Sequence, residues 1–329
     1  MSKYLACSLM RITKFIKPVL IIAAVILFAA GCKAEKGREI VDRAGITVKI
    51  NAPINRIVST APSNTEIIAD LGMAHKLVAI DRHSVNVVGI PANLPLLDFF
   101  YPDAEVIVSL EPDIIIASGH NPTGTGEDPF RLLREMGIPV VYISMSKSID
   151  DIYRDIAFVA DVLQIQKKGE EIIRSMQDQI TQIVLQYVSQ SVSQDVIQKK
   201  TVYFEISAAP DMMSFGKDSF INDMISVIGA RNIFENEDWL VTPGAEAIIS
   251  RNPDVILTNV NYIDDPIGEI KSRPGFNHIN AIINDRVYQI DTDSSVRPSS
   301  RIILALRQMS QAVYPEAYSP DYSGAGAVR

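Results

Sequence analysis

Side chains with the chemistry to hold a small molecule occur in short polar stretches, most of them directly after an apolar run that can form a buried strand. They are Ser63, Arg82, His83, Tyr101 and His120 in the first half of the chain, and Met213, Trp239, Tyr262 and Arg297 in the second half. Aromatic rings and methionine suit a large, partly apolar ligand, and arginine suits a carboxylate or an anionic chelate. We therefore expect these positions to line the binding site of a bulky ligand.

Metal chemistry depends on the four histidines, His75, His83, His120 and His278. No two of them have a spacing typical of a metal site, and a closed transition-metal site needs about three or four converging ligands. His83 and His120 do follow expected strands, so a role as ligand to a haem iron or to a metal stays open. We expect no resident metal and no cofactor, and direct binding of zinc or manganese is the less favoured interpretation.

Sequence motifs of the common enzyme classes are absent. The chain contains no Gly-x-Ser-x-Gly elbow, HExxH pair, phosphate-binding loop or glycine-rich dinucleotide fingerprint. Gly119 to Gly126 holds three glycines, but Pro122 interrupts the stretch and no Lys-Ser/Thr pair follows. The carboxylates of Asp98 and Asp211 suit acid–base work, yet nothing in the sequence couples them. The prediction is a binding protein and not an enzyme, with a hydrolytic or chelatase-like enzyme as the alternative.

The elements that must position these side chains alternate between strand and helix. Strands are expected at 46–50, 56–60, 77–80, 114–117 and 139–143, and helices at 62–71, 104–110 and 129–136. Buried strands that alternate with short helices indicate parallel βαβ units.

The second half of the chain repeats this pattern. Residues 104–116 align without gaps on residues 245–257, 141 positions later, and seven of the thirteen residues are identical. A Pro-Asp turn by itself is ordinary chemistry between a helix and a strand, but the preceding Ala-Glu pair makes a chance match less credible. The fold class is therefore expected to be α/β, with two Rossmann-like lobes of parallel sheet.

A helical connection is expected between the lobes. Ser148 and Asp151 can form a capping box, and apolar residues keep a helical spacing beyond it, with a break near 164–169. A helix of about 20 residues spans roughly 30 Å, which predicts a long rigid strut. We expect an N-terminal lobe at 46–146, the connecting helical segment at 147–187, a surface loop at 188–200, a C-terminal lobe at 201–318 and a tail at 319–329.

The first residues predict export and lipid attachment. A basic start is followed by twelve apolar residues at 19–30, which are too few to cross a bilayer as a permanent helix. They end in Ala29-Ala30-Gly31-Cys32, which resembles a bacterial lipobox with Ala29 where leucine is commoner. We expect a signal peptide at 1–31, a lipidated Cys32 and a tether at 32–45. An uncleaved anchor helix is the alternative, and in both cases the rest of the chain lies outside the cytoplasm, in the periplasm or at the cell surface.

Charge and cysteine content exclude other classes. The chain after residue 31 carries 27 basic and 39 acidic residues, a formal charge of −12, which argues against binding nucleic acid by phosphate neutralisation. Cys7 lies in the leader and Cys32 is used for lipid, so no pair is left for a disulfide or a cysteine metal site.

Taken together, the order and spacing of the motifs resemble the class III periplasmic binding proteins of ABC importers, the family of vitamin B12, iron-siderophore and haem binders. The resemblance covers about 46–315, and its motifs are Arg56-Ile57-Val58-Ser59, Glu105 with Pro112-Asp113, the run from Gly216 to Asn232, Glu246 with Pro253-Asp254, and Arg297-Pro298. It implies two lobes on a rigid helix that move little on binding.

The resemblance also implies partners. Glu105 and Glu246 fall where one surface glutamate of each lobe docks on arginines of the importer's membrane subunits, and Trp239 falls where similar B12 binders place an aromatic wall. The expected function is a lipid-anchored monomer that captures a ferric siderophore, cobalamin or haem between the lobes and delivers it to the permease. ATP hydrolysis on separate subunits then drives release. Binding of a free metal or an oxyanion is a further alternative.

Overall fold

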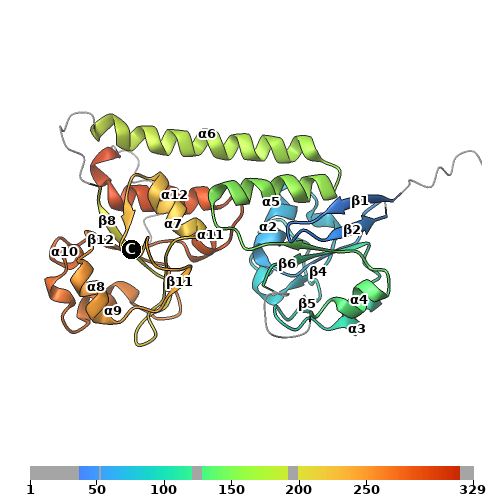
Figure 1. Cartoon of the computed structure of the whole chain (residues 1–329), viewed down its shortest axis with the longest axis horizontal. Coiled ribbons are helices and arrows are strands. Elements are labelled where there is room, and N and C mark those ends of the chain that lie inside the picture. Colours follow the sequence, from blue (N-terminus) through green and yellow to red (C-terminus); the bar gives the residue numbers. More distant parts are fainter. Residues whose placement is uncertain (1–36, 52, 121–127, 192–198, 319–329) are drawn as a thin grey trace, which may run out of the picture.

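The computed structural model describes residues 37–318, apart from position 52, the segments 121–127 and 192–198, and the side chains at 187–191. The expected leader, Cys32 and the tail at 319–329 lie outside the described residues. Two lobes lie side by side, and helices α5 (Ile149–Val162) and α6 (Gln166–Ser191) run along one side of them (Figure 1). Within the described ranges, no helix combines the length and the apolar character needed to cross a membrane.

The N-terminal lobe contains a parallel sheet with the strand order β5-β4-β3-β6-β7. Its strands are β3 (Ile57–Ser59), β4 (Leu77–Asp81), β5 (Leu96–Leu97), β6 (Ile114–Ser118) and β7 (Val140–Ile143). The connections contain α2 (Pro62–Asp70), α3 (Ala104–Ser109), α4 (Arg131–Glu135) and the 3-10 turns η1 (Ala74–Lys76) and η2 (Arg82–Ser84). An antiparallel hairpin of β1 (Arg38–Val41) and β2 (Thr47–Ile50) precedes this sheet.

The C-terminal lobe contains a parallel sheet with the order β10-β8-β12-β13. Its strands are β8 (Thr201–Glu205), β10 (Arg231–Asn232), β12 (Val255–Thr258) and β13 (Val287–Gln289), and a separate hairpin pairs β9 (Ser214–Phe215) with β11 (Leu240–Val241). Its helices are α7 (Phe220–Val227), α8 (Ala245–Arg251), α9 (Pro266–Ser272), α10 (Asn280–Ile283), α11 (Thr292–Val296) and α12 (Ile302–Val313), with 3-10 turns η3 (Phe276–His278) and η4 (Pro315–Ala317).

The expected duplication is present in the backbone. The order β4-β3-β6-β7 of the first lobe matches β10-β8-β12-β13 of the second. Asp113 accepts hydrogen bonds from the two amides just before β3 (2.7 and 2.9 Å), and Asp254 accepts one from the first amide of β8 (2.9 Å). Glu111 and Asn252, again 141 positions apart, both have a positive φ (44° and 46°) in the turn before the Pro-Asp pair. The predicted α/β fold with two parallel lobes is confirmed.

One buried core runs through both lobes. Ile57 and Ile116 of the first sheet and Val202 and Leu257 of the second belong to the same cluster of buried apolar side chains, to which α5, α6, α7 and α12 contribute. Alternate residues such as Val58, which face the opposite side of their sheet, belong to a separate cluster in each lobe. The lobes are therefore joined by a common apolar layer as well as by the chain.

Two expected boundaries differ from the structure. Arg38–Val41 fall in the expected tether but form β1, because Asp42 caps the hairpin turn and accepts a bond from the Tyr142 amide (2.9 Å), while Arg43 is paired with Asp155. Helix α6 also continues to Ser191, into the segment expected as a loop, and its 26 residues correspond to about 39 Å.

Candidate ligand-binding site

The expected ligand residues of the N-terminal lobe lie at the carboxyl ends of its strands, where ligands bind in parallel α/β sheets. Ser63 lies in the first turn of α2 after β3, Arg82 and His83 form η2 after β4, and Tyr101 follows β5. His120 comes two residues after β6. The strand order brings all of these loops to one edge of the sheet.

Phe99 is the centre of the aromatic cluster at this edge. The ring of His83 packs edge-on to it with centroids 6.1 Å apart, and the ring of His120 packs on it at 5.7 Å. Phe100 stacks edge-on against it at 4.8 Å and is itself well exposed. Packing removes water from His120 and lowers the pKa of its imidazole, so the ring is held in the neutral form that suits metal coordination or stacking.

The loop after β5 is shaped by Asp98. Its carboxylate accepts from the amides of Phe100 and Tyr101, both at 3.0 Å, and lies 3.5 Å from the Arg82 guanidinium. These backbone hydrogen bonds, with a smaller contribution from Arg82, lower the pKa of Asp98. The side chain of Tyr101 projects into solvent, so it is placed at the edge of the cluster and not within it.

Buried hydroxyl groups support the cluster from below. Asp81 accepts from the His83 amide (2.8 Å) and from the hydroxyl of Ser84, whose oxygen lies 3.0 Å from the hydroxyl oxygen of Thr65. Thr65 donates to Ser59 (2.8 Å). Burial raises the pKa of Asp81, and the bonds from Ser84 and His83 oppose that shift. These hydrogen bonds hold the η2 turn, which contains Arg82 and His83, in place.

The C-terminal lobe presents a second set of exposed aromatic side chains. The hydroxyl of Tyr262 accepts from the amide of Ala208 (2.8 Å), and the strand-like bridge between Ser207 and Met213 closes the loop beside it. Trp239, 37% exposed, packs on Phe215 at 5.6 Å between the hairpin strands β9 and β11. Met213, Trp239 and Tyr262 therefore belong to the loops that follow β8 and β12 and to the hairpin between them.

A buried ion pair lies beneath these loops. The Glu205 carboxylate at the end of β8 receives both terminal nitrogens of Arg273 (2.6 and 2.8 Å), and Nη1 of Arg273 also donates to the sulfur of Met212 (3.2 Å). Glu269 is the second carboxylate on this guanidinium. The two carboxylates raise the pKa of Arg273 against the opposing effect of burial, so the cation is permanent.

Arg297 lies between the lobes. Its Nη1 donates to Glu66 of α2 (2.9 Å) and its Nη2 donates to the carbonyl of His83 (3.1 Å) and pairs with Asp293 (2.8 Å). The structure thus brings Arg297 and the His83 turn together across the lobe boundary. Sequence reasoning attached no role to Glu66, because its partner is 231 residues away.

The two expected docking glutamates occupy corresponding places. Glu105 is in the first turn of α3, Glu246 is in the first turn of α8, and both are exposed. A carboxylate at a helix N-terminus is stabilised by the helix dipole and is open to a bidentate arginine.

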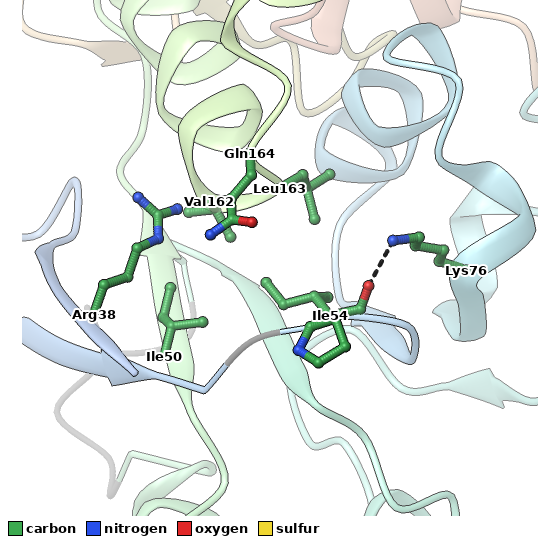
Figure 2. Close-up of a pocket in the computed structure, with 8 residues that line it drawn as sticks. Arg38, Ile50, Ile54, Lys76, Val162, Leu163 and Gln164 are labelled. Atoms are coloured by element: carbon green, nitrogen blue, oxygen red, sulfur yellow. Dashed lines mark hydrogen bonds between the residues drawn. The ribbon is translucent and has the colours of Figure 1, made fainter. Parts of the chain in front are cut away.

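A small pocket elsewhere lies between the β1–β2 hairpin, the residues before β3 and β4, and the end of α5 (Figure 2). It has a volume of about 90 Å³ and is lined by Arg38, Ile50, Pro53, Ile54, Lys76, Val162, Leu163 and Gln164. Lys76 donates to the carbonyl of Ile54 (2.6 Å) and Arg38 pairs with Asp161 (2.9 Å), so both cations already have partners. The pocket is too small for a metal chelate.

The described residues contain no group of three or more His, Cys, Asp or Glu side chains arranged to hold a metal ion. The glycine-bearing stretch weighed as a phosphate loop lies at 121–127 for the most part, outside the described residues. Sequence reasoning selected Tyr101 from the Phe99-Phe100-Tyr101 run, although Phe99 makes the ring contacts with both histidines. Three aromatic residues in succession indicate an aromatic loop, but they do not indicate which of the three rings contacts the histidines.

Two α/β lobes whose strand ends carry aromatic, histidine and arginine side chains define a bilobal binding protein. In agreement, residues 57–294 match the family described as periplasmic binding protein. An uncharacterized ABC transporter substrate-binding lipoprotein of Bacillus subtilis is 29% identical over 91% of this chain and 96% of its own. A vitamin B12-binding protein of Vibrio parahaemolyticus is 23% identical over 79% of this chain and 90% of its own.

A solved structure has the same fold. It is a possible iron-binding (periplasmic solute-binding) protein from Staphylococcus epidermidis, 28% identical, which covers 80% of this chain and 100% of its own with a TM-score of 0.69. Since the family match spans most of the chain, the protein belongs to the periplasmic binding protein family, the substrate-binding proteins of ABC transporters.

Proposed function

We propose that this protein captures a metal chelate, either a corrinoid, a ferric siderophore or haem, between its two lobes and delivers it to an ABC permease. The observation that supports the proposal is a pair of aromatic groups in the proposed ligand loops, the rings of His83 and His120 on Phe99 in one lobe and the ring of Trp239 on Phe215 in the other. Flat, apolar macrocycles and aromatic chelates gain most from such rings.

The ligand would contact both lobes. Ser63, Arg82, His83, Tyr101 and His120 form the N-terminal half of the proposed site, and Met213, Trp239 and Tyr262 form the C-terminal half. Arg297 enters the proposal as the cation at the lobe boundary next to the site, where it contacts Glu66, the His83 carbonyl and Asp293. The B12-binding relative supports a corrinoid as the first ligand to test.

Delivery and anchoring complete the proposal. Glu105 and Glu246 would meet arginines of two permease subunits, and acylated Cys32 would attach the protein to the membrane. The lipoprotein relative from Bacillus subtilis supports the anchor. Globomycin, which blocks lipoprotein signal peptidase, should cause the uncleaved precursor to accumulate, and a Cys32→Ser variant should incorporate no labelled palmitate.

The ligand is tested by titrating the protein without residues 1–31 with cyanocobalamin, haemin and ferrioxamine. Trp239 is the single tryptophan and reports on its own surroundings. We expect one probe to quench its fluorescence with one-to-one stoichiometry at submicromolar concentration, and calorimetry excludes inner-filter artefacts. If calorimetry detects no heat with any probe, the chelate proposal is wrong, and molybdate and free divalent cations are tested next.

A further inference from the structure

Polar contacts join α2 of the N-terminal lobe to the segment between α11 and α12 of the C-terminal lobe. One oxygen of Glu66 accepts from Arg297 Nη1 (2.9 Å) and the other accepts from the Ser299 hydroxyl (2.6 Å). One turn further along α2, Asp70 accepts from the Ser300 hydroxyl. The Glu66 side chain is 2% exposed and that of Arg297 is 12% exposed, so the contact is shielded from water.

Burial makes this contact sensitive to geometry. A buried carboxylate is tolerated only when its oxygens have partners, and both oxygens of Glu66 do. A displacement of one lobe by a few ångströms would break both bonds at once and leave the buried carboxylate of Glu66 without these partners. The contact therefore favours one placement of the lobes over neighbouring ones.

The same arginine reaches the proposed ligand loop. Its Nη2 donates to the carbonyl of His83 (3.1 Å), and the His83 ring packs on Phe99. Asp293, from the C-terminal lobe, holds this nitrogen in place (2.8 Å). The position of the His83 turn is thus tied to the position of the opposite lobe.

A second contact restrains the lobes beside the connecting helix. Asp223 of α7 accepts from the amide of Ile149 at the start of α5 (2.8 Å), and the apolar layer shared by both lobes packs around these helices. These contacts restrain the relative placement of the lobes beside α5 and α6. Glu66 and Arg297 restrain it at the His83 turn.

We infer that Glu66 and Arg297 are positioning residues that hold the two lobes and the His83 turn in a preformed binding geometry. Arg297 would then act on the ligand through the His83 turn and not by direct contact. The effect on ligand affinity rests on the proposed function, whereas the effect on lobe placement does not.

The experiment measures the distance between the lobes by double electron–electron resonance. Spin labels at Ser109→Cys and Ser250→Cys occupy corresponding exposed positions on α3 and α8. The full chain is studied in detergent with Cys7→Ser and Cys32→Ser, so that the introduced cysteines are the only ones. Glu66→Gln and Arg297→Gln are compared with Arg131→Gln, a control outside the proposed site whose ion pair with Glu135 lies within α4 of one lobe.

We expect a narrow distance distribution without ligand in the parent and in Arg131→Gln, and a broader one in Glu66→Gln and Arg297→Gln. Arg297→Lys should give a distance distribution narrower than that of Arg297→Gln but broader than that of the parent, because lysine retains the positive charge. The double variant Glu66→Gln/Arg297→Gln leaves no buried charge without a partner, since Asp293 is partly exposed, and it therefore controls for misfolding of a single variant. Unchanged distributions in all of these variants would overturn the inference.

Affinity for cyanocobalamin, or for haemin if cobalamin does not bind, is the second readout. We expect the dissociation constant to rise about tenfold in Glu66→Gln, although Glu66 does not contact the ligand. If no probe binds the parent, the proposed function fails while the distance measurement still tests the inference. If Arg297→Gln weakens binding but Glu66→Gln alters neither distance nor affinity, Arg297 contacts the ligand directly and the inference is wrong.

Discussion

Thr60 and Glu205 occupy corresponding positions in the two lobes, as the pairing of Ile57 with Ile114 and of Val202 with Val255 shows. Thr60, directly after β3, has a hydroxyl that accepts from the Ser118 amide (3.2 Å), whereas Glu205, the last residue of β8, is a buried charge paired with Arg273. The turns around the Pro-Asp pairs have stayed alike in both lobes. The difference teaches that the two lobes share their strands and Pro-Asp turns but differ in the residues beneath the proposed ligand loops.

The two lobes should be equally necessary for docking, and this is the largest effect that we predict. Glu105→Arg and Glu246→Arg should each reduce transport by more than about tenfold and together abolish it, because an arginine would face the permease arginines. Ligand affinity should stay unchanged in a titration of the purified variants. Glu135→Arg, at another exposed helix position, is the control, and normal uptake by the double variant would refute the docking role.

The buried charge of the C-terminal lobe should make that lobe the more sensitive one to substitution. Arg273→Met leaves the carboxylate of Glu205 unpaired, so the free energy of unfolding should fall by roughly 3–5 kcal/mol. Thr60→Val, the corresponding change in the N-terminal lobe, should lower it by about 1 kcal/mol. Urea unfolding followed by circular dichroism measures both, and equal losses would contradict the contrast between the lobes.

The N-terminal lobe has a pH-dependent contact of its own where the β1–β2 hairpin meets α5. Asp155, 1% exposed, accepts from Arg43 (2.5 Å) and Ser146 (2.8 Å), and Asp151 also faces Arg43. Burial raises the pKa of Asp155 to about 6, against the effect of Arg43. Since this pKa exceeds the ordinary value of 3.8, the stability it contributes is complete below about pH 4 and is lost as the pH rises through 6.

The test is the free energy of unfolding of the parent and of Asp155→Asn between pH 4 and pH 7. Relative to the variant, the parent should lose stability on the order of 2 kcal/mol over this range. Ser146→Ala, which keeps the carboxyl group, should retain the pH dependence. Parallel curves for the parent and Asp155→Asn would show that Asp155 does not titrate there.

The smallest predicted effect comes from the caps of the corresponding helices. Asp103 caps α3 by accepting from two amides, whereas Gly244 offers α8 no side-chain cap. Asp103→Ala should lower the free energy of unfolding by about 1 kcal/mol. Gly244→Ser should raise it by a few tenths of a kcal/mol, because a side chain there meets no neighbouring atom and the backbone is extended. Thermal unfolding resolves both, and a loss of stability in Gly244→Ser would contradict the capping argument.

Patterns among neighbouring residues were sufficient to predict the fold class and the presence of two similar lobes. Apolar strands, the helical period and the repeat at 104–116 and 245–257 are all encoded within a few neighbouring residues, and they predicted the α/β class and the equivalence of the lobes. Strand β1 was missed because its charged start resembles a solvent-exposed tether, and the contacts that hold it are with distant groups, the Asp161 carboxylate of α5 and the Tyr142 amide of β7.

The site was predictable only as a set of loops. The carboxyl-end rule placed His83 and His120 at one edge, but their shared contact with Phe99 depends on side-chain packing. Likewise, Arg297 is a plausible anion ligand by residue type, and only the fold brings Glu66 beside it. Contacts between distant parts of the chain leave no local signal in a single sequence.

The apolar layer that runs through both lobes has a consequence for how the chain acquires its structure. Ile302 and Leu306 of α12 share a cluster with Ile152 and Ile156 of α5, so neither half can bury its apolar face alone. The lobes resemble each other in sequence and strand order, but we do not expect them to unfold as independent cooperative units. A chain severed between α6 and β8 should yield two fragments that aggregate separately and regain solubility only when refolded together.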